Sequence, residues 1–163
     1  MLQGYGLTEN AAAAMATPPD YPVCGTVGCC FACSEVKVVD VKEMNYLSTD
    51  TPHPRGEICL RGPNVFKGYH NLPEKTAEAL DADGWLHTGD IGQFLPDGSL
   101  QIIDRKKNIF KLSQGEYVAA EELEGIFGRS DYVNQLWIYG NRCDAWVLMQ
   151  ARMRAHVHPH SHS

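Results

Sequence analysis

Apolar and polar residues alternate in several short stretches of the chain, which is the pattern of half-buried β-strands. Residues 35–41 (EVKVVDV) and 57–61 (EICLR) both follow this period of two, so they are expected to form a pair of strands. Residues 91–95 and 99–103 lie on either side of the turn sequence Pro96-Asp97-Gly98. Because glycine tolerates the positive φ of a tight turn, this arrangement predicts a β-hairpin.

Two short helices and two further strands are expected elsewhere. A helix should begin at Asn71, whose side chain can accept a backbone N–H, and should end near Leu80. Residues 119–127 predict a second, amphipathic helix with acidic residues in its first turn. Residues 133–139 and 145–149 predict strands, so the chain is expected to be rich in β-structure with few helices.

The composition is that of an ordinary globular domain. Of the 163 residues, 44% are hydrophobic and 21% are charged, and the net charge is −6. This charge excludes the basic surface that binding to nucleic acid or anionic lipid requires. No apolar run approaches the ~20 residues that span a bilayer, so no transmembrane segment is expected. The N-terminus lacks the cationic and apolar regions of a signal peptide, which predicts an intracellular protein.

Six cysteines are present, and without a secretory signal they are expected to be reduced thiols. The cluster Cys29-Cys30-x-x-Cys33 raises the alternative of a zinc site. Zinc ligands usually lie on converging turns with a second matching pair, whereas this cluster runs directly into the strand predicted from Glu35. We therefore favour small thiols beside a strand over zinc ligation.

The last residues have a different composition, with histidine at alternate positions: His156, His158, His160 and His162. Alternating histidines can chelate a divalent metal on an extended chain, but nothing in the sequence enforces a geometry. We expect residues 151–163 to form a disordered, His-rich tail.

The first motif with functional chemistry is Gly4-Tyr5-Gly6-Leu7-Thr8-Glu9. Its glycines, Gly6 among them, allow the backbone N–H groups of a loop to approach an anion. The hydroxyl of Thr8 can donate to a phosphate oxygen, and the carboxylate of Glu9 can bind Mg²⁺, which prefers oxygen ligands. Tyr5 offers a flat face to a purine. The alternative is an ordinary strand and turn.

Two later motifs supply a carboxylate and a cluster of cations. Asp90 follows a Thr-Gly turn, where its carboxylate can accept hydrogen bonds from both hydroxyls of a ribose, although such a sequence is more often a turn cap. The segment Asp104–Lys111 holds four cations in eight residues and precedes a Gly-containing loop. Such a cluster suits a phosphate or a ribose, the alternative being a solvated charged turn.

In this order and with these spacings, the three motifs resemble those of the AMP-forming, adenylate-forming enzymes. From Gly4 to about Gly140 the chain is similar to long-chain acyl-CoA synthetases. Residues 62–69 (GPNVFKGY), 83–92 (DGWLHTGDIG) and 104–117 carry this narrower similarity to the fatty-acyl branch.

The resemblance implies an α+β fold built from parts of two domains. Residues 1–103 would be the C-terminal part of the large AMP-binding domain, with an antiparallel β-rich subdomain over residues 20–103. Residues 104–150 would contain the hinge and the start of the small α+β C-terminal domain. Residues 151–163 would remain the His-rich tail.

The resemblance also implies a role for each residue of the first two motifs. In this family a carboxylate attacks the α-phosphate of ATP, and acyl-adenylate and pyrophosphate result. Tyr5 would pack on adenine, Thr8 would contact the α-phosphate and Glu9 would hold Mg²⁺. Asp90 would bind the ribose hydroxyls, and Arg105 would assist at the ribose.

In the second half-reaction of the family, the thiol of coenzyme A displaces AMP. Lys111 and Gly115 match the loop that faces the active site in this thioester-forming conformation. Asp104 falls at the hinge about which the small domain turns. The implied function is activation of a long-chain fatty acid, with fatty acid, ATP and CoA as partners and Mg²⁺ as cofactor.

The chain also departs from the family pattern. It lacks the phosphate loop that the family places upstream and the adenylation lysine near the C-terminus, so we expect a partial product without ligase activity by itself. The alternatives are a non-catalytic nucleotide-binding or interaction module, and a ligase for another acid of the aromatic or coumarate type. Relatives of this type work at endoplasmic-reticulum, peroxisomal or plastid membranes, with which the whole enzyme could associate.

Overall fold

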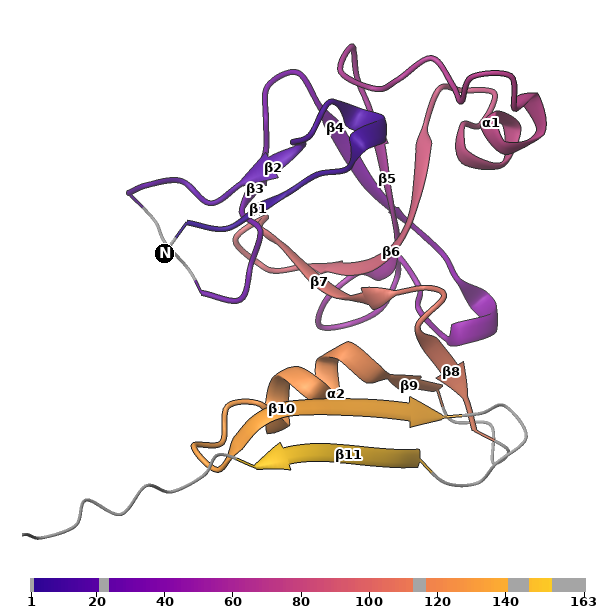
Figure 1. Cartoon of the computed structure of the whole chain (residues 1–163). Helices are drawn as coiled ribbons and strands as arrows, with labels where there is room; N and C mark the ends of the chain where they lie inside the picture. The colour runs from indigo at the N-terminus through magenta and orange to yellow at the C-terminus, as the bar shows by residue number, and fades with distance from the viewer. Residues whose placement is uncertain (1, 21–23, 113–116, 141–146, 154–163) are drawn as a thin grey trace, which may run out of the picture. The chain divides into compact units, whose positions relative to one another are not determined.

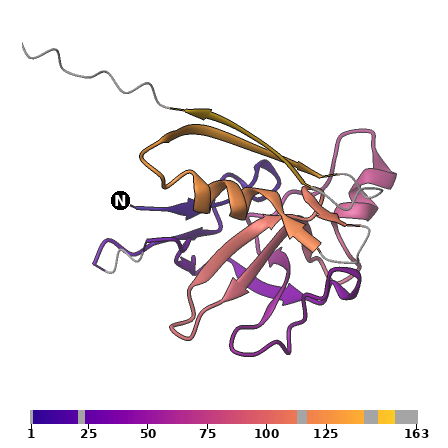
Figure 2. The same ribbon diagram turned by 90° about the horizontal axis from the view of Figure 1, so that it is seen from below.

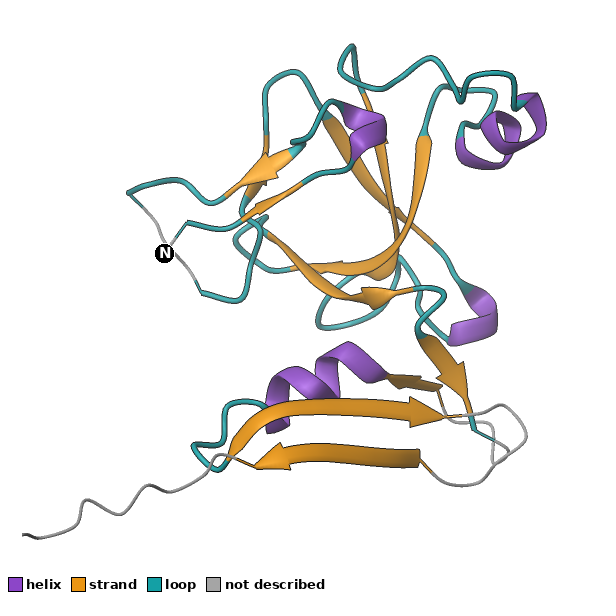
Figure 3. Ribbon diagram, viewed as in Figure 1, coloured by secondary structure: helices purple, strands orange, loops and turns teal. Residues whose placement is uncertain are grey.

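The computed structural model describes residues 2–20, 24–112, 117–140 and 147–153. The chain divides into two compact units, residues 1–107 and residues 108–163. The division follows Lys107, four residues after the end of the large-domain part expected from the sequence. Figure 1 gives the element labels, and Figure 3 separates the strands from the few helices.

The first unit is built on a four-stranded antiparallel sheet. Its strands are adjacent in the sheet in their sequence order: β4 (Glu35–Val39), β5 (Arg55–Arg61), β6 (Leu86–Phe94) and β7 (Leu100–Arg105). The pairing of Val38 with Ile58 and of Phe94 with Leu100 confirms the strand pair and the hairpin predicted from the sequence. Strand β6 begins earlier than predicted because Leu86 and His87 already pair with β5.

A smaller three-stranded sheet lies N-terminal to these strands in the sequence. It contains β1 (Gly4–Tyr5), β2 (Met15–Ala16) and β3 (Cys29–Cys30) in that order. Two backbone hydrogen bonds join the segment before β3 to β7. Val27 N–H donates to Leu100 O (2.8 Å), and Leu100 N–H donates to Gly28 O (3.0 Å). These bonds fix the N-terminal motif against the larger sheet.

The core of the first unit lies between the two sheets. Its fully buried members are aliphatic or sulfur-containing side chains from both: Ala14, Met15, Ile58, Leu60, Leu86 and Leu100. By contrast, the cysteines of the N-terminal cluster (Cys29, Cys30 and Cys33) are exposed at and beside β3. Burial of the aliphatic groups is the main favourable contribution to the stability of this unit.

Two short helical segments connect the strands of the large sheet. The 3₁₀ turn η2 (Lys42–Met44) follows β4, and the helix α1 (Pro73–Ala79) precedes β6. The predicted capping by Asn71 is wrong: the N-cap is Leu72, without a side-chain cap, and Asn71 has a φ of 54°. The Asn71 side chain instead contacts its neighbour, with Nδ2 at 3.1 Å from His70 Nε2.

The second unit contains one helix and four strands within its described residues. The strands β8 (Ile109–Lys111) and β9 (Tyr117–Ala119) pair antiparallel, and α2 (Ala120–Phe127) follows directly. The longer strands β10 (Val133–Gly140) and β11 (Val147–Met153) form a second antiparallel pair, which Figure 2 shows in orange and yellow beside the helix. The predicted helix 119–127 and the strand 133–139 are confirmed.

Strand β11 changes the boundary expected for the C-terminal tail. Ala151, Arg152 and Met153 were expected in a disordered segment, but they pair with β10, where Ala151 lies opposite Leu136. The cross-strand hydrogen bonds of this register outweigh the polar composition of the segment. Residues 154–163, with the alternating histidines, lie outside the described residues.

Neither of the two α-helices that the described ranges contain has the length and apolarity needed to cross a membrane.

Candidate functional site

A hollow of about 660 Å³ lies beside the N-terminal motif in the first unit. It is lined by residues 6–9, Ala11, Ala12 and Arg105. Four of these positions, Gly6, Thr8, Glu9 and Arg105, belong to the residues selected from the sequence. The fold thus brings residues separated by about a hundred positions to one concave surface.

The loop that forms one wall of the hollow is tightly folded. Strand β1 ends at Tyr5 and the 3₁₀ turn η1 (Thr8–Asn10) follows. The buried Asn10 accepts the Leu7 N–H through Oδ1 (2.8 Å), and Ala14 N–H donates to Tyr5 O (2.9 Å). Gly6 is required by close approach, because a Cβ there would lie 1.9 Å from the backbone oxygen of Ala12.

Asp90 joins this loop to the sheet. Its side chain is 8% exposed and both of its oxygens have partners. Tyr5 Oη donates to Asp90 Oδ2 (2.7 Å), and Arg105 Nε lies 3.3 Å from Asp90 Oδ1. Three residues that the sequence motifs selected independently therefore form one cluster. Burial and, to a smaller degree, the Asp90 carboxylate raise the pKa of Tyr5, so its phenol stays a hydrogen-bond donor.

The carboxylate of Glu9 has a partner that the sequence analysis did not select. Tyr69 Oη donates to Glu9 Oε1 (2.8 Å), and this bond to an acceptor carboxylate raises the pKa of Tyr69. The backbone is linked as well, since Phe66 N–H donates to Glu9 O (2.7 Å). Tyr69 belongs to the Gly62–Tyr69 stretch that marks the fatty-acyl resemblance, but nothing in that stretch assigns a role to its phenol.

The remaining predicted residues are not part of this cluster. Thr8 is exposed at the start of η1. Asp104 is fully buried in β7, where it lies opposite Ile91 and its Oδ1 accepts the Arg105 N–H (2.6 Å). Lys111 belongs to the second unit, where its Nζ lies 5.1 Å from the centre of the Tyr117 ring. Gly115 lies outside the described residues.

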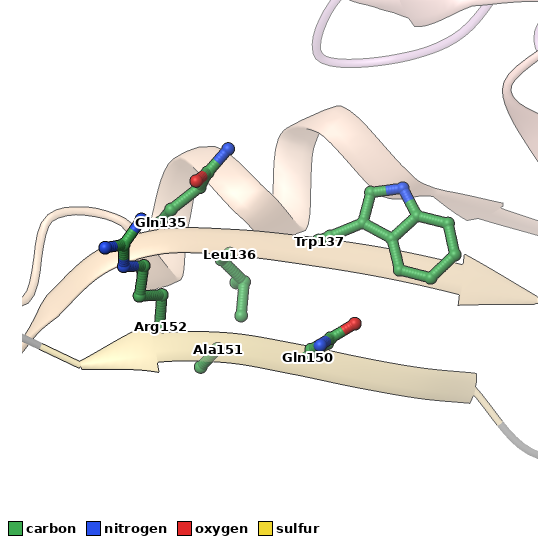
Figure 4. Close-up of a pocket in the computed structure, with 6 residues that line it drawn as sticks. All are labelled: Gln135, Leu136, Trp137, Gln150, Ala151 and Arg152. Atoms are coloured by element: carbon green, nitrogen blue, oxygen red, sulfur yellow. The ribbon is translucent and has the colours of Figure 1, made fainter.

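A second hollow, of about 430 Å³, lies on the β10–β11 pair. It is lined by Gln135, Leu136, Trp137, Gln150, Ala151 and Arg152, which Figure 4 shows. Trp137 stacks on Tyr139 with ring centres 5.5 Å apart. This lining has one cation and no carboxylate, whereas protein Mg²⁺ sites usually use one or two carboxylates. The hollow beside the N-terminal motif is the better candidate for nucleotide chemistry.

The buried thiol of Cys59, in β5, lies close to the imidazole of His87, in β6. Cys59 Sγ is 3.5 Å from His87 Nδ1, an arrangement that in other contexts activates a nucleophile. Here burial first, and the nearby Glu57 carboxylate second, raise the pKa of Cys59 to about 12. The thiol therefore stays protonated at neutral pH, and the Cys59–His87 pair is excluded as a catalytic dyad.

Cys59 should resist alkylation in the folded protein. With a pKa near 12, only roughly 10⁻⁴ of this thiol is ionised at pH 8. We expect iodoacetamide at pH 8 to modify the exposed Cys24, Cys29, Cys30 and Cys33 while Cys59 stays unmodified, as measured by peptide mass spectrometry. Labelling in denaturant is the control. Modification of Cys59 at the rate of the exposed thiols would contradict its burial and its raised pKa.

Comparison with known proteins gives the family of these motifs. Residues 1–70 match the model of the AMP-binding enzyme family. The chain is 55% identical over 148 residues to Fatty acyl-CoA synthetase A of Dictyostelium discoideum, covering 91% of this chain and 22% of that protein. It is 55% identical over 139 residues to the peroxisomal Long chain acyl-CoA synthetase 7 of Arabidopsis thaliana, covering 85% and 20%.

The solved structures agree with the sequence relatives. The A domain of the carboxylic acid reductase from Segniliparus rugosus, in complex with AMP and a co-purified carboxylic acid, superposes with a TM-score of 0.80 at 34% identity. The match covers 94% of this chain and 23% of that one, and it confirms the expected α+β fold of the adenylate-forming enzymes. The chain spans about a fifth of the length of the curated relatives it matches. Its motifs, its fold and its relatives agree: this chain is similar to a segment of the AMP-forming acyl-CoA synthetases of the long-chain type, and its residues 1–70 match the AMP-binding enzyme family.

Proposed function

We propose that this chain supplies part of the nucleotide site of an ATP-dependent long-chain fatty-acid–CoA ligase. The observation that carries the proposal is the cluster of Asp90, Tyr5 and Arg105 at the hollow formed by the N-terminal loop. In the proposed reaction, a fatty-acid carboxylate attacks the α-phosphate of ATP, and pyrophosphate leaves. The thiol of CoA then attacks the acyl carbon, and AMP leaves.

Asp90 is proposed to bind the two ribose hydroxyls. Oδ2 accepts a hydrogen bond from Tyr5 and Oδ1 forms an ion pair with Arg105, and a carboxylate has about four acceptor positions, so at least two remain for a ribose. Arg105, whose side chain is half exposed, would lie at the ribose together with Asp90. The phenol bond orients the ring of Tyr5, whose face is proposed to pack on adenine.

Thr8 and Glu9 are proposed to act at the phosphates. The exposed Thr8 hydroxyl is free to donate to an α-phosphate oxygen as negative charge increases there in the transition state. Glu9 shares the hollow with Thr8 and offers the oxygen ligand that Mg²⁺ prefers. Bound Mg²⁺ would neutralise phosphate charge. The residues present fit such an ion, because Tyr69 engages only one oxygen of Glu9.

Lys111 and Gly115 are proposed to contribute to the thioester-forming half-reaction. Their assignment rests on the family resemblance of the loop that contains them. Fatty acid, ATP and CoA are the proposed partners of the whole enzyme, and its proposed site is an intracellular membrane. The name of the Arabidopsis thaliana relative supports the peroxisome as one such site.

A hybrid enzyme tests the proposed function. In Fatty acyl-CoA synthetase A of Dictyostelium discoideum, the segment matched over 148 residues would be replaced by the corresponding part of this chain. We expect the hybrid to form palmitoyl-CoA from palmitate, ATP, Mg²⁺ and CoA. A folded hybrid without ligase activity would refute the proposal, and a preference for coumarate over palmitate would favour the aromatic-acid alternative.

Replacement of Tyr69 by phenylalanine should weaken Mg²⁺ binding in the hybrid enzyme. The phenol holds Glu9 in place, and loss of such an outer-shell hydrogen bond typically costs about 10-fold or more in metal affinity. We expect the Mg²⁺ concentration for half-maximal activity to rise by about 10-fold, with a smaller change in the KM for palmitate. Lys67→Ala, an exposed change in the same stretch, is the control. An unchanged Mg²⁺ dependence would contradict a role for Tyr69 at Glu9.

A further inference from the structure

Asp90 is presented by an irregularity in the sheet. Between β5 and β6, Cys59 lies opposite His87 while Glu57 lies opposite Ile91, so β6 contains two residues more than β5 over this interval. Gly89 within this bulge has a φ of +72°, a conformation that glycine adopts without strain. Bulges of this kind re-aim a side chain, here that of Asp90.

The bulge cannot use the regular bonds of the ladder, and other groups hold it in place. Thr88 Oγ1 donates to Ile58 O (2.8 Å) and accepts the Asp90 N–H (3.1 Å). Gly89 O accepts the Lys106 N–H (2.8 Å). The Gly89 N–H donates to the carboxylate of Glu57, at 3.1 Å from Oε1. The side chain of Glu57 thus accepts the N–H of Gly89, the residue that immediately precedes Asp90.

Glu57 is well placed for this role. Its side chain is only 13% exposed, and its second oxygen, Oε2, lies 3.6 Å from Lys106 Nζ and 3.8 Å from His87 Nδ1. One oxygen therefore holds the bulge, and the other faces two cationic or potentially cationic groups. Lys106 therefore contacts the same carboxylate that accepts the Gly89 N–H.

We propose that Glu57 is a positioning residue of the nucleotide site, which holds the Gly89 bulge so that Asp90 meets the ribose hydroxyls. This inference rests on the proposed function of Asp90. Glu57 does not line the hollow beside the N-terminal motif. Its effect reaches the ribose through the Gly89 N–H and the backbone of Asp90, while Lys106 contacts the Glu57 carboxylate through Nζ and the Gly89 carbonyl through its backbone N–H.

The test uses the 163-residue protein and two NMR measurements on one ¹⁵N-labelled sample. Without nucleotide, Glu57→Ala should raise the exchange rate of the Gly89 amide by about 10-fold or more, because this amide loses its acceptor. The amide of Val38, in the regular β4–β5 pairing, should be unaffected. Titration should then show affinity for AMP falling about 10-fold, with no change for 2′,3′-dideoxy-AMP, which lacks both ribose hydroxyls.

Glu43→Ala is the matched control. Glu43 also faces Lys106 (3.5 Å), but no bond joins its side chain to Gly89, so its removal should change neither measurement. In an Asp90→Asn background, Glu57→Ala should cause no further loss of AMP affinity, since Glu57 acts through Asp90. If Glu57→Ala does not fold, Glu57→Met carries the test, because methionine nearly keeps the side-chain volume but has no oxygen to accept the Gly89 N–H, and it should give the same AMP-selective loss.

The outcomes distinguish the positioning role of Glu57 from the proposed nucleotide site. An unchanged Gly89 exchange rate, or equal losses with AMP and dideoxy-AMP, overturns the positioning role of Glu57 and leaves the nucleotide site intact. Absence of AMP binding by the unaltered protein overturns the proposed nucleotide site, and with it the action of Glu57 on the ribose.

Discussion

Replacing Asp90 by alanine should lower the affinity for AMP by about 100-fold or more. Each ribose hydroxyl would lose a hydrogen bond to a charged acceptor, and such bonds contribute about 1.5–3 kcal/mol each. The loss should depend on the hydroxyls: 2′,3′-dideoxy-AMP should bind the variant and the unaltered protein equally. NMR titration of the 163-residue protein measures both affinities. In the hybrid enzyme, the KM for ATP should rise in parallel.

The Asp90→Ala change also leaves Tyr5 without its acceptor, which is expected to cost about 1–3 kcal/mol of stability. Circular dichroism and thermal unfolding must therefore accompany the titration. Asp83→Ala is the control, since Asp83 is an exposed carboxylate in the turn before β6, and its loss should alter neither affinity. An equal loss of affinity for both nucleotides would show that Asp90 supports the fold but does not contact the ribose.

Replacing Gly6 by alanine should have the second large effect. The new Cβ would lie 1.9 Å from the Ala12 oxygen and 2.6 Å from the Ala13 Cα, both backbone atoms, so the loop itself must move. Thr8 and Glu9 lie on this loop, and a displacement of about 1 Å at a reacting centre can cost 10²-fold in rate. We expect kcat/KM of the hybrid enzyme to fall by about 10²-fold or more, as measured by palmitoyl-CoA formation.

Gly125 provides the matched control for this glycine. A Cβ at Gly125 meets nothing within 4 Å, and the residue lies within α2. Alanine there should leave activity unchanged and should stabilise the protein by about 0.5–1 kcal/mol, since glycine is a poor helix former. If Gly6→Ala retained full activity, the tight turn at Gly6 could not be what positions Thr8 and Glu9.

The sequence by itself determined much of the first unit and selected the residues proposed for its site. Alternating residues located β4, β5 and the β6–β7 hairpin, because period-two patterns report burial of one sheet face directly. Residue types and their order selected Tyr5, Thr8, Asp90 and Arg105 and led to the correct family. The binding chemistry of the motifs could be proposed without the fold, because a hydrogen-bond donor, a carboxylate or an aromatic ring offers the same kinds of contact in any fold.

Only the tertiary structure decided how these groups meet and what holds them. The bond from Tyr5 to Asp90 joins residues 85 positions apart, and Tyr69 reaches Glu9 across 60. Such contacts depend on how distant segments pack, and the two-residue bulge that exposes the Gly89 N–H to Glu57 depends on strand register. Register is set by pairing between distant strands. No local pattern encodes it, so the partners of Asp90 and Glu9 emerge only when the sheet is assembled.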